Sequence, residues 1–332
     1  MNPKLMLMLF LAMLFSCKKP VDHPYDFQQI VVGAGPEDMV VDTSESLPRI
    51  LVSCADRRSI YEPFGEIVAY TPATGKIDTL QRIGQPDSLH FNPHGIFLDK
   101  QSSPPLLYTI SHERDQGFHP VYIWEVRGDS LIYSNLIYSP LVYSPNALTL
   151  GADGEIYIVN DCGKRGRFIE KVLKMRKANI VRMDVGKDGS IDARIVARRL
   201  GYPAGINRIG DQLYAGDAVL NRIHIYTISG DQLIKNKAWK GFKGNDNIRI
   251  HNDTLILAGH VKPFKYIGHV ISQENKSPVR IWELDPATRN SKILFDTDGE
   301  AISAGSTGLL LDGNLYVSQV FDPFIIEVKM EQ

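Results

Sequence analysis

The sequence predicts an all-β fold, a six-bladed β-propeller, on two observations. From Ile30 onward, short apolar strands alternate with turns rich in Gly, Asp, Asn and Pro, and helical periodicity is scarce. The strands also recur in a fixed order: one begins after a polar residue, a second ends in polar residues, and a third and fourth form a hairpin. This order occurs six times at a spacing of roughly 40–60 residues, which is the range of propeller repeats.

Each blade needs a first strand that lines the central channel and a second strand that pairs with it. The first strands are expected at residues 37–42, 94–99, 146–150, 204–209, 246–250 and 306–311. The second strands are expected at residues 50–54, 106–111, 155–160, 212–217, 254–260 and 314–319. Outer hairpins are expected at residues 66–75, 121–129, 180–189, 223–231 and 279–285. One such unit cannot bury both of its faces alone, so the six units must pack into a ring.

The ring is expected to close between the two ends of a single domain, residues 27–332. The sixth unit is incomplete at the C-terminus, where residues 324–329 supply a last strand, and residues 28–32 are the natural candidate to complete it. Residues 18–26 are expected to be a short linker. A sandwich or a jelly roll is the competing all-β architecture, but neither explains six recurrences of one strand order.

Residues 1–17 resemble a lipoprotein-type signal segment. Lys4 precedes the start of an apolar run over residues 5–15, which is too short to span a bilayer as a mature helix. The next residues complete a Leu-Phe-Ser-Cys sequence similar to a bacterial lipoprotein box, which implies cleavage before Cys17 and lipidation of that cysteine. The alternative is an ordinary secretory signal with an incidental cysteine. Both place the protein outside the cytoplasm, and the first predicts a lipid anchor in the envelope of a bacterium, facing the periplasm or the outer surface.

Composition and charge narrow the partners. The net charge is −1 with both signs interspersed, which disfavours nucleic-acid binding, and we expect a monomer. Cys54 and Cys162 either pair in an oxidising compartment or remain two buried thiols. Residues 163–178 interleave basic and apolar side chains, which predicts a short amphipathic helix inserted in the third blade. This helix would be a solvated covering turn, a lid over the channel, or a patch that faces anionic lipid.

The residues that begin the first strands predict a metal site. In a propeller these positions gather at one end of the channel, although they are far apart in the sequence. Glu37, Asn146, Asp246 and Asn247 would bring four carboxylate or amide oxygens together there. An all-oxygen set without a thiolate suits Ca²⁺ better than Zn²⁺. The alternative is that Asn and Asp begin these strands because they favour turns.

Several of these segments resemble the paraoxonases, calcium-dependent lactonases and arylesterases that are related to the gluconolactonase-like propellers. Residues 91–96, Phe-Asn-Pro-His-Gly-Ile, are very similar to the family's Asn-Pro-His-Gly-Ile segment. Similar segments follow the same order at residues 35–38, 111–112, 202–207, 246–248 and 304–307. The resemblance runs from about Gly33 to the end of the chain.

The resemblance implies hydrolysis of a small ester or lactone. It implies one catalytic calcium bound by Glu37, Asn146, Asp246 and Asn247. His94 and His112 would form the pair that activates water or relays a proton, which suits histidine because its pKa lies near neutral pH. Asp38 and the backbone carbonyl of Ile96 would face a second, structural calcium.

The chain departs from the family pattern at two positions. Ala204 stands where the family has an asparagine ligand, a loss that water or Asn207 would have to fill. Ala147 stands where an aspartate ligand of the structural ion is expected, which puts that second ion in question. His260 ends a second strand and is a candidate to border the substrate pocket.

Other chemistry is disfavoured. No Gly-x-Ser-x-Gly motif, glycine-rich phosphate loop or zinc signature occurs in the sequence. The alternative to an enzyme is a non-catalytic propeller of the cell envelope that binds a ligand or partner at its channel face, since propellers host many functions.

Overall fold

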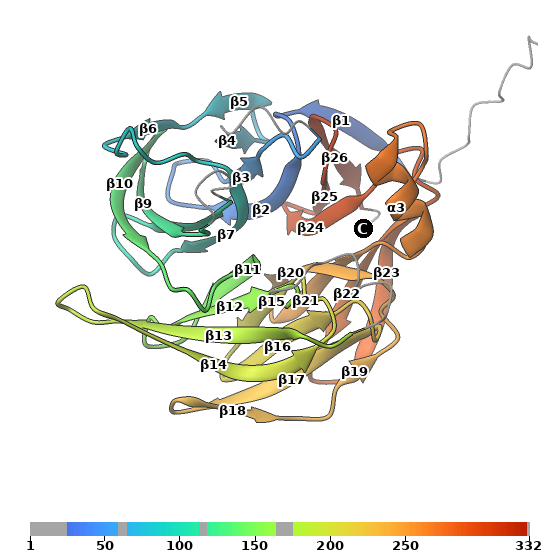
Figure 1. The fold of residues 1–332 in the computed structure, drawn as a ribbon. Helices are drawn as coiled ribbons and strands as arrows, with labels where there is room; N and C mark the ends of the chain where they lie inside the picture. The colour runs from blue at the N-terminus through green and yellow to red at the C-terminus, as the bar shows by residue number, and fades with distance from the viewer. Residues whose placement is uncertain (1–24, 59–64, 113–117, 164–174, 331–332) are drawn as a thin grey trace, which may run out of the picture.

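Six antiparallel sheets surround a central channel in the computed structural model, which describes residues 25–58, 65–112, 118–163 and 175–330. Figure 1 shows the innermost strands around the centre of the ring and the outermost strands at its periphery. The predicted six-bladed β-propeller is confirmed, and a strand occupies every position expected for a first or second strand.

The first three blades follow one another along the chain. Blade 1 contains β2 (Pro36–Asp42), β3 (Arg49–Cys54), β4 (Glu66–Thr71) and β5 (Lys76–Thr79). Blade 2 contains β7 (Pro93–Asp99), β8 (Leu106–Ser111), β9 (Val121–Arg127) and β10 (Ser130–Ile137), with β6 (Gln81–Ile83) parallel to β10 at the outer edge. Blade 3 contains β11 (Pro145–Leu150), β12 (Ile156–Asn160), β13 (Ala178–Val185) and β14 (Ile191–Leu200).

The last three blades complete the circle. Blade 4 contains β15 (Ile206–Ile209), β16 (Gln212–Asp217), β17 (Arg222–Ser229) and β18 (Gln232–Lys235), and β19 (Trp239–Lys240) also pairs with β17. Blade 5 contains β20 (Asn245–His251), β21 (Thr254–Gly259), β22 (Val279–Asp285) and β23 (Asn290–Thr297). The helix α3 (Pro263–Ile271) connects β21 to β22. Blade 6 contains β24 (Gly305–Leu311), β25 (Asn314–Gln319), β26 (Phe324–Lys329) and β1 (Phe27–Val31).

Blade 6 joins the two ends of the chain. β1 pairs antiparallel with β26, with Phe27 opposite Val328 and Val31 opposite Phe324. The ring therefore closes as the sequence predicts, because an unpaired last strand would leave its backbone donors and acceptors without partners.

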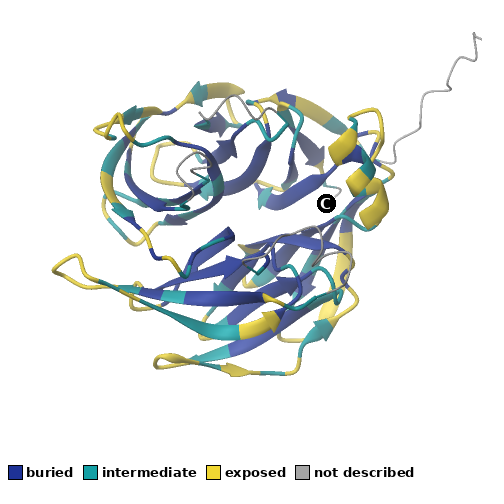
Figure 2. Cartoon of the chain, in the orientation of Figure 1, coloured by how far each residue is buried: buried dark blue, intermediate teal, exposed yellow. Residues whose placement is uncertain are grey.

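The core lies between the blades. Between blades 1 and 2, Trp124 and Tyr122 pack with Leu51 and Ile67, and all four side chains are fully or almost fully buried. Burial of each such side chain stabilises the fold by about 1.5–3 kcal/mol. Figure 2 shows the buried residues concentrated in the inner strands, with exposed residues in the outer turns. The rigid inner ring is what positions the polar residues at the channel end.

Cys54 and Cys162 are both buried and are not joined by a disulfide, so that alternative is not realised. Cys162 donates its thiol to Ser144 Oγ at 3.2 Å, and burial raises the pKa of the Cys54 thiol. The signal segment and most of the linker lie outside the described residues, as do residues 164–174, the larger part of the predicted basic helix. The described end of that segment leads directly into β13 at Ala178. In the part of the chain that is described, no helix has the length and apolar character needed to cross a membrane.

Candidate functional site

The first strands share an irregularity at the end where the polar residues gather. In five of the six blades the pairing of the first with the second strand skips one or two residues at that end. The skipped positions are Glu37, His94–Gly95, Asn146–Ala147, Asp246–Asn247 and Ser306–Thr307. Such bulges release a residue from the ladder and change the direction of its side chain. Five of the candidate residues, Glu37, His94, Asn146, Asp246 and Asn247, therefore lie at these bulges.

Contacts between neighbouring blades hold these bulges together. A Cβ added at Gly95 would lie 2.2 Å from the backbone oxygen of Asn146, and one at Gly205 would lie 2.4 Å from that of Asp246. Only glycine permits such close approach of one strand to the next. Between blades 6 and 1, Thr307 Oγ1 donates to the backbone oxygen of Glu37 at 3.0 Å. The ring therefore brings residues from distant parts of the sequence within contact.

Glu37 lies at the centre of this site and is 2% exposed. Its Oε1 accepts hydrogen bonds from Ser306 Oγ at 2.9 Å and from Asn247 Nδ2 at 3.1 Å. Its Oε2 is buried and makes no hydrogen bond. Burial, together with the nearby carboxylates of Asp38 and Asp246, raises the pKa of Glu37 to about 8. A buried carboxylate in this environment is stabilised in its charged form by a cation.

Asp246 is the second carboxylate of the site. It is 7% exposed, and its Oδ2 is 2.9 Å from Nε2 of His260. The ring of Tyr266 from α3 stacks on His260 with centroids 4.1 Å apart. His260, a candidate to border the pocket, therefore contacts a predicted ligand directly and is itself fixed by α3.

The two asparagines differ in what they present. The Oδ1 atom of Asn146 is buried and has no hydrogen-bond partner. Asn247 directs its Nδ2 toward Glu37, Ser306 and Thr307. As placed, Asn247 is a donor to the carboxylate, and binding a cation would need the opposite orientation of its amide.

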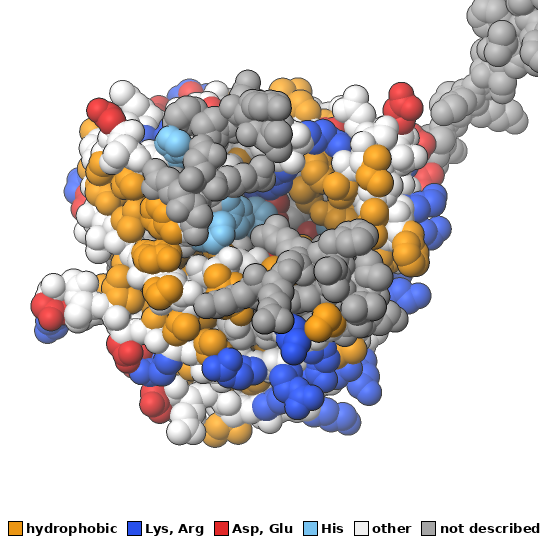
Figure 3. Space-filling view, in the orientation of Figure 1, with side chains coloured by type: hydrophobic (Ala, Val, Ile, Leu, Met, Phe, Trp, Pro, Cys, Tyr) orange, Lys and Arg blue, Asp and Glu red, His pale blue; other side chains and the backbone are white. Residues whose placement is uncertain are grey.

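The histidine pair predicted from the sequence is joined by a third ring. The rings of His94 and His112 have centroids 4.7 Å apart, and His112 Nδ1 is 3.2 Å from Nδ1 of His119. His94 Nδ1 is 3.7 Å from Glu37 Oε2 and 2.9 Å from Nη2 of Arg57. Figure 3 shows histidine side chains gathered near the centre of this face of the molecule.

The oxygen atoms present fit one cation at Glu37. Two buried oxygens without hydrogen-bond partners, Glu37 Oε2 and Asn146 Oδ1, belong to predicted ligands, and the Asp246 carboxylate contributes a second negative charge. Carboxylate and amide oxygens are the ligands that Ca²⁺ prefers. No set of three or more His, Cys, Asp or Glu side chains among the described residues would hold a metal by itself. The fit therefore depends on the asparagine oxygen and on water.

A second ion at Asp38 does not fit. Asp38 is fully buried and forms an ion pair with Nη2 of Arg249, and the same nitrogen donates to the backbone oxygen of Ile96 at 3.0 Å. A guanidinium group thus binds both oxygens that the resemblance assigns to a structural calcium, and Ala147 offers no side-chain oxygen. The Asp38 carboxylate and the Ile96 backbone oxygen are therefore both already bound to Arg249.

Asn207 does not replace the ligand lost at Ala204. Its Nδ2 donates to the backbone oxygen of Ile248 at 3.1 Å, and its Oδ1 accepts from Thr149 Oγ1 at 3.3 Å. Asn207 also lines a separate cavity of about 240 Å³ further along the channel. A cation at this site would therefore need water in place of the asparagine oxygen.

Sequence reasoning missed Arg57, His119, Arg249 and Tyr266. Arg249 follows Asn247 by two residues on β20, so the alternation of side chains along a strand indicates that both face the channel. The other three come from loops or from α3, where no periodic signal predicts contact with the site.

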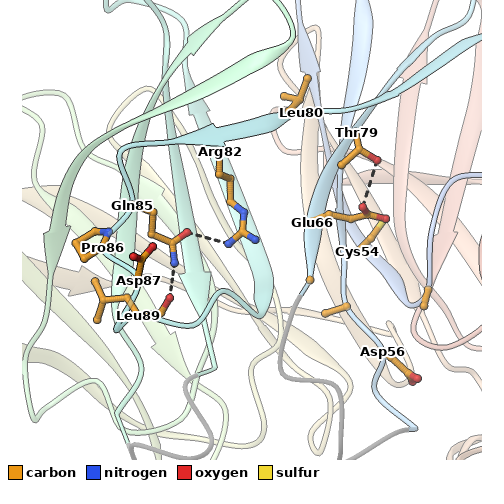
Figure 4. A pocket seen from close by; sticks show the side chains of 13 residues that line it. Cys54, Asp56, Glu66, Thr79, Leu80, Arg82, Gln85, Pro86, Asp87 and Leu89 are labelled. Carbon is orange, nitrogen blue, oxygen red and sulfur yellow. Dashed lines mark hydrogen bonds between the residues drawn. The ribbon is translucent and has the colours of Figure 1, made fainter.

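A pocket of about 710 Å³ between blades 1 and 2 is separate from these residues. Its walls include Glu66, which accepts from Thr79 Oγ1 at 3.2 Å, and Arg82, which donates to Gln85 at 2.8 Å (Figure 4). None of the histidines or predicted ligands lines it. Gln85 also donates to the backbone oxygen of Leu89 at 2.6 Å, and we assign this pocket no role.

Comparison with solved structures agrees with the propeller fold. A gluconolactonase from Xanthomonas campestris is 13% identical with a TM-score of 0.58, covering 92% of this chain and 89% of the other. A luciferin-regenerating enzyme is 12% identical with a TM-score of 0.57, covering 92% of this chain and 95% of the other. An aldose sugar dehydrogenase from Streptomyces coelicolor, in its PQQ-bound form, is 14% identical with a TM-score of 0.56, covering 93% and 100%. At these identities the likeness concerns the fold.

The family follows from the sequence. No curated protein gives a significant match. The family model described as Arylesterase matches residues 67–324, which is well over half of the chain. The resemblance found in the short motifs is thus confirmed over most of the propeller, and the chain belongs to the arylesterase family of paraoxonase-type proteins.

Proposed function

We propose that this protein is a calcium-dependent hydrolase of small esters or lactones. Membership in the arylesterase family supports a hydrolase of this type, and that family is generally calcium-dependent. The observation that carries the finer proposal is a buried oxygen without a hydrogen bond on each of two predicted ligands, Glu37 and Asn146, with His94 Nδ1 3.7 Å from the Glu37 oxygen. These residues would supply ion-binding oxygens and a proton acceptor at the same end of the channel.

The carboxylates of Glu37 and Asp246 and the amide oxygen of Asn146 would hold the ion, and the amide of Asn247 would turn over to present its oxygen. When bound there, Ca²⁺ supplies polarisation of the substrate carbonyl and charge stabilisation for the oxygen that becomes negative. His260 holds Asp246 through its Nε2, and Ser306 holds Glu37, so both carboxylates are oriented before the substrate arrives. Orientation in advance lowers the reorganisation needed during the reaction.

His94 is positioned to take a proton from water. A guanidinium only donates, so the contact with Arg57 makes Nδ1 of a neutral His94 the acceptor and puts the ring proton on Nε2. Nδ1 also faces Glu37, and it can accept a proton from water there once Arg57 releases it. His112 and His119 extend the pair, because their Nδ1 atoms at 3.2 Å can share one proton.

The reaction balances without another reagent. Water adds its oxygen to the carbonyl carbon, and its proton passes to the histidines. The bond between the carbonyl carbon and the alcohol oxygen then breaks, and the proton returns to that oxygen, so that an acid and an alcohol are formed.

The test is hydrolysis of phenyl acetate and a panel of small lactones, with and without EDTA and with calcium added back. We expect activity that chelation abolishes and calcium restores. Activity unaffected by chelation would refute the role of the ion. Inactivity on every substrate, with calcium still raising the melting temperature, would refute catalysis and favour a propeller that binds a ligand at its channel face.

A further inference from the structure

The cavity of about 240 Å³ occupies the channel beyond the candidate site. Every first strand contributes to its wall, through Val40, Leu98, Thr149, Asn207, Arg249 and Leu309. These residues lie three or four positions further along their strands than Glu37 and its counterparts at the other end of the channel. At about 3.3 Å per residue, the cavity is therefore about 10–13 Å from the candidate site. None of the histidines or predicted ligands lines it.

The wall of this cavity carries positive charge. Lys100, Arg208 and Arg249 line it, and no aspartate or glutamate does. Arg249 pairs with Asp38, and Arg208 donates to two backbone oxygens. Asp42, at the end of β2, pairs with an arginine of its own blade. In the described part of the chain, Lys100 and Arg208 therefore border the cavity without forming an ion pair with a carboxylate.

Arg249 also has a buried donor that no protein group accepts. The residue is 8% exposed, and its Nη2 binds Asp38 and the Ile96 oxygen, whereas its buried Nε makes no hydrogen bond. Buried polar groups nearly always have a partner, so the acceptor is water or an oxygen of a ligand in the cavity. The positive wall favours an anionic ligand, and a carboxylate matches the geometry of a guanidinium.

The remaining wall is largely apolar. Phe97, Leu150, Ile250 and Leu310 line the cavity, and Ile250 is 37% exposed. Lys100 is exposed as well, so these two residues lie where the cavity opens to solvent. An inorganic anion would leave the apolar side chains against water, whereas an apolar chain on the ligand would cover them. The cavity is smaller than the roughly 300–1,000 Å³ of pockets for drug-sized ligands, so the chain must be short.

We propose that this end of the channel binds a small carboxylate with a short apolar chain. The carboxylate accepts a hydrogen bond from Arg249 Nε and faces the charge of Arg208, and the chain packs on Phe97 and Leu150. Lys100 attracts the anion at the opening. This site is distinct from the one at Glu37 and needs no metal, so it does not depend on the proposed catalysis.

Titration calorimetry of the full chain with hexanoate tests this site, after dialysis against EDTA to remove any cation from the Glu37 end. Hexan-1-ol, which keeps the chain without the charge, and acetate, which keeps the charge without the chain, are the comparison ligands. Lys100→Gln removes a charge from the opening, and Ile250→Trp obstructs it. Lys235→Gln is the matched control, because Lys235 is exposed on the outer strand of blade 4. The melting temperature of each variant verifies that it is folded.

We expect hexanoate to bind about tenfold or more tightly than hexan-1-ol or acetate, with affinity rising about three- to fourfold for each CH₂ added from butanoate to hexanoate. Lys100→Gln should weaken hexanoate binding by about two- to fivefold and Ile250→Trp by more, whereas Lys235→Gln should leave it unchanged. No binding of hexanoate by the folded wild-type chain would leave the cavity to water and overturn the proposal. Equal binding of hexanoate and hexan-1-ol would overturn it as well. So would hexanoate binding that is lost in Glu37→Gln and unchanged in Lys100→Gln and Ile250→Trp, since the acid would then lie at the candidate site.

Discussion

Replacing Arg249 by methionine should destabilise the propeller through the carboxylate that remains. Arg249 is 8% exposed, its guanidinium pairs with the fully buried Asp38, and it bonds the Ile96 oxygen of blade 2, on the opposite side of the ring from β20. Methionine is of similar length but supplies neither charge nor donor. Asp38 would then be a buried negative charge without a cation, in a site where Glu37 and Asp246 are also close.

The expected loss of unfolding free energy depends on the contacts that Asp38 keeps in the variant. Removal of one partner from a buried ion pair costs about 3–5 kcal/mol. Asp38 keeps hydrogen bonds from the backbone N–H groups of Met39 and Ile96, both at 2.9 Å, and from Thr307 Oγ1 at 3.0 Å. The loss should therefore lie near the lower limit. For a domain of about 300 residues, with an unfolding entropy of about 0.6 kcal/mol/K, a loss of about 3 kcal/mol lowers the melting temperature by about 5 °C.

Calorimetry of three variants tests this reasoning. Arg208→Met is the control. Arg208 donates to the backbone oxygens of Leu150 and Gly210 and pairs with no carboxylate, so the free energy of unfolding should fall less in this variant than in Arg249→Met. The double variant Asp38→Asn/Arg249→Met should be more stable than Arg249→Met, since both charges are removed. Equal losses in Arg249→Met and the control, or a double variant with the sum of the single losses, would refute the argument. So would binding of two equivalents of calcium by the wild-type protein, because Arg249 leaves room for one.

Three further outcomes are expected. His94→Gln should abolish ester hydrolysis while the melting temperature still rises with calcium; retained hydrolysis would exclude His94 as the proton acceptor. Asp246→Ala should lose activity and most of the rise in melting temperature that calcium gives, because a ligand that binds only the native state stabilises it; an unchanged rise would exclude Asp246 as a ligand. Burial, opposed by the hydrogen bond to the Asn275 oxygen, lowers the pKa of His269, so the unfolded chain takes up a proton below about pH 6.5 that the folded chain does not. Stability present above that pH is therefore lost as the pH falls, and His269→Gln should show a smaller loss of unfolding free energy between about pH 7.5 and 5.5; an equal loss would contradict this.

The blades could be predicted from the sequence because their signal is local and repeated. Every first and second strand begins and ends close to its expected position, and the closing pair β1 and β26 follows from the incomplete sixth unit. The helix α3 could not be predicted by the usual rule. That rule assumes an apolar face turned inward, whereas Tyr266 and His269 are the residues that α3 directs toward the propeller.

The sequence also predicts that the residues beginning the first strands approach one another in the propeller. It does not predict which of their side chains form hydrogen bonds or ion pairs with each other. The sequence indicates that Glu37, Asp246 and His94 approach one another, and the structure places their side chains in one cluster. It does not indicate the bulges that skip these residues in the strand pairing, because a bulge is decided by backbone geometry between two strands. Asn207 shows the limit: it belongs to a strand that lacks such a bulge, and its side chain bonds elsewhere.

Arg249 explains why the fold does not depend on a structural calcium at Asp38, although Ala147 stands where a ligand of that ion is expected. At Asp38 the charge of a mobile ion is supplied by a side chain that is part of β20, so no binding equilibrium is needed to neutralise the carboxylate. At Glu37, buried oxygens without partners remain, and the raised pKa of Glu37 reflects the cost of keeping its charge without a cation. The two carboxylates are adjacent in the sequence, yet one pairs with a guanidinium and the other keeps a buried oxygen without a hydrogen bond. We therefore expect calcium binding, measured by titration calorimetry, to be weakened more by Glu37→Gln than by Asp38→Asn.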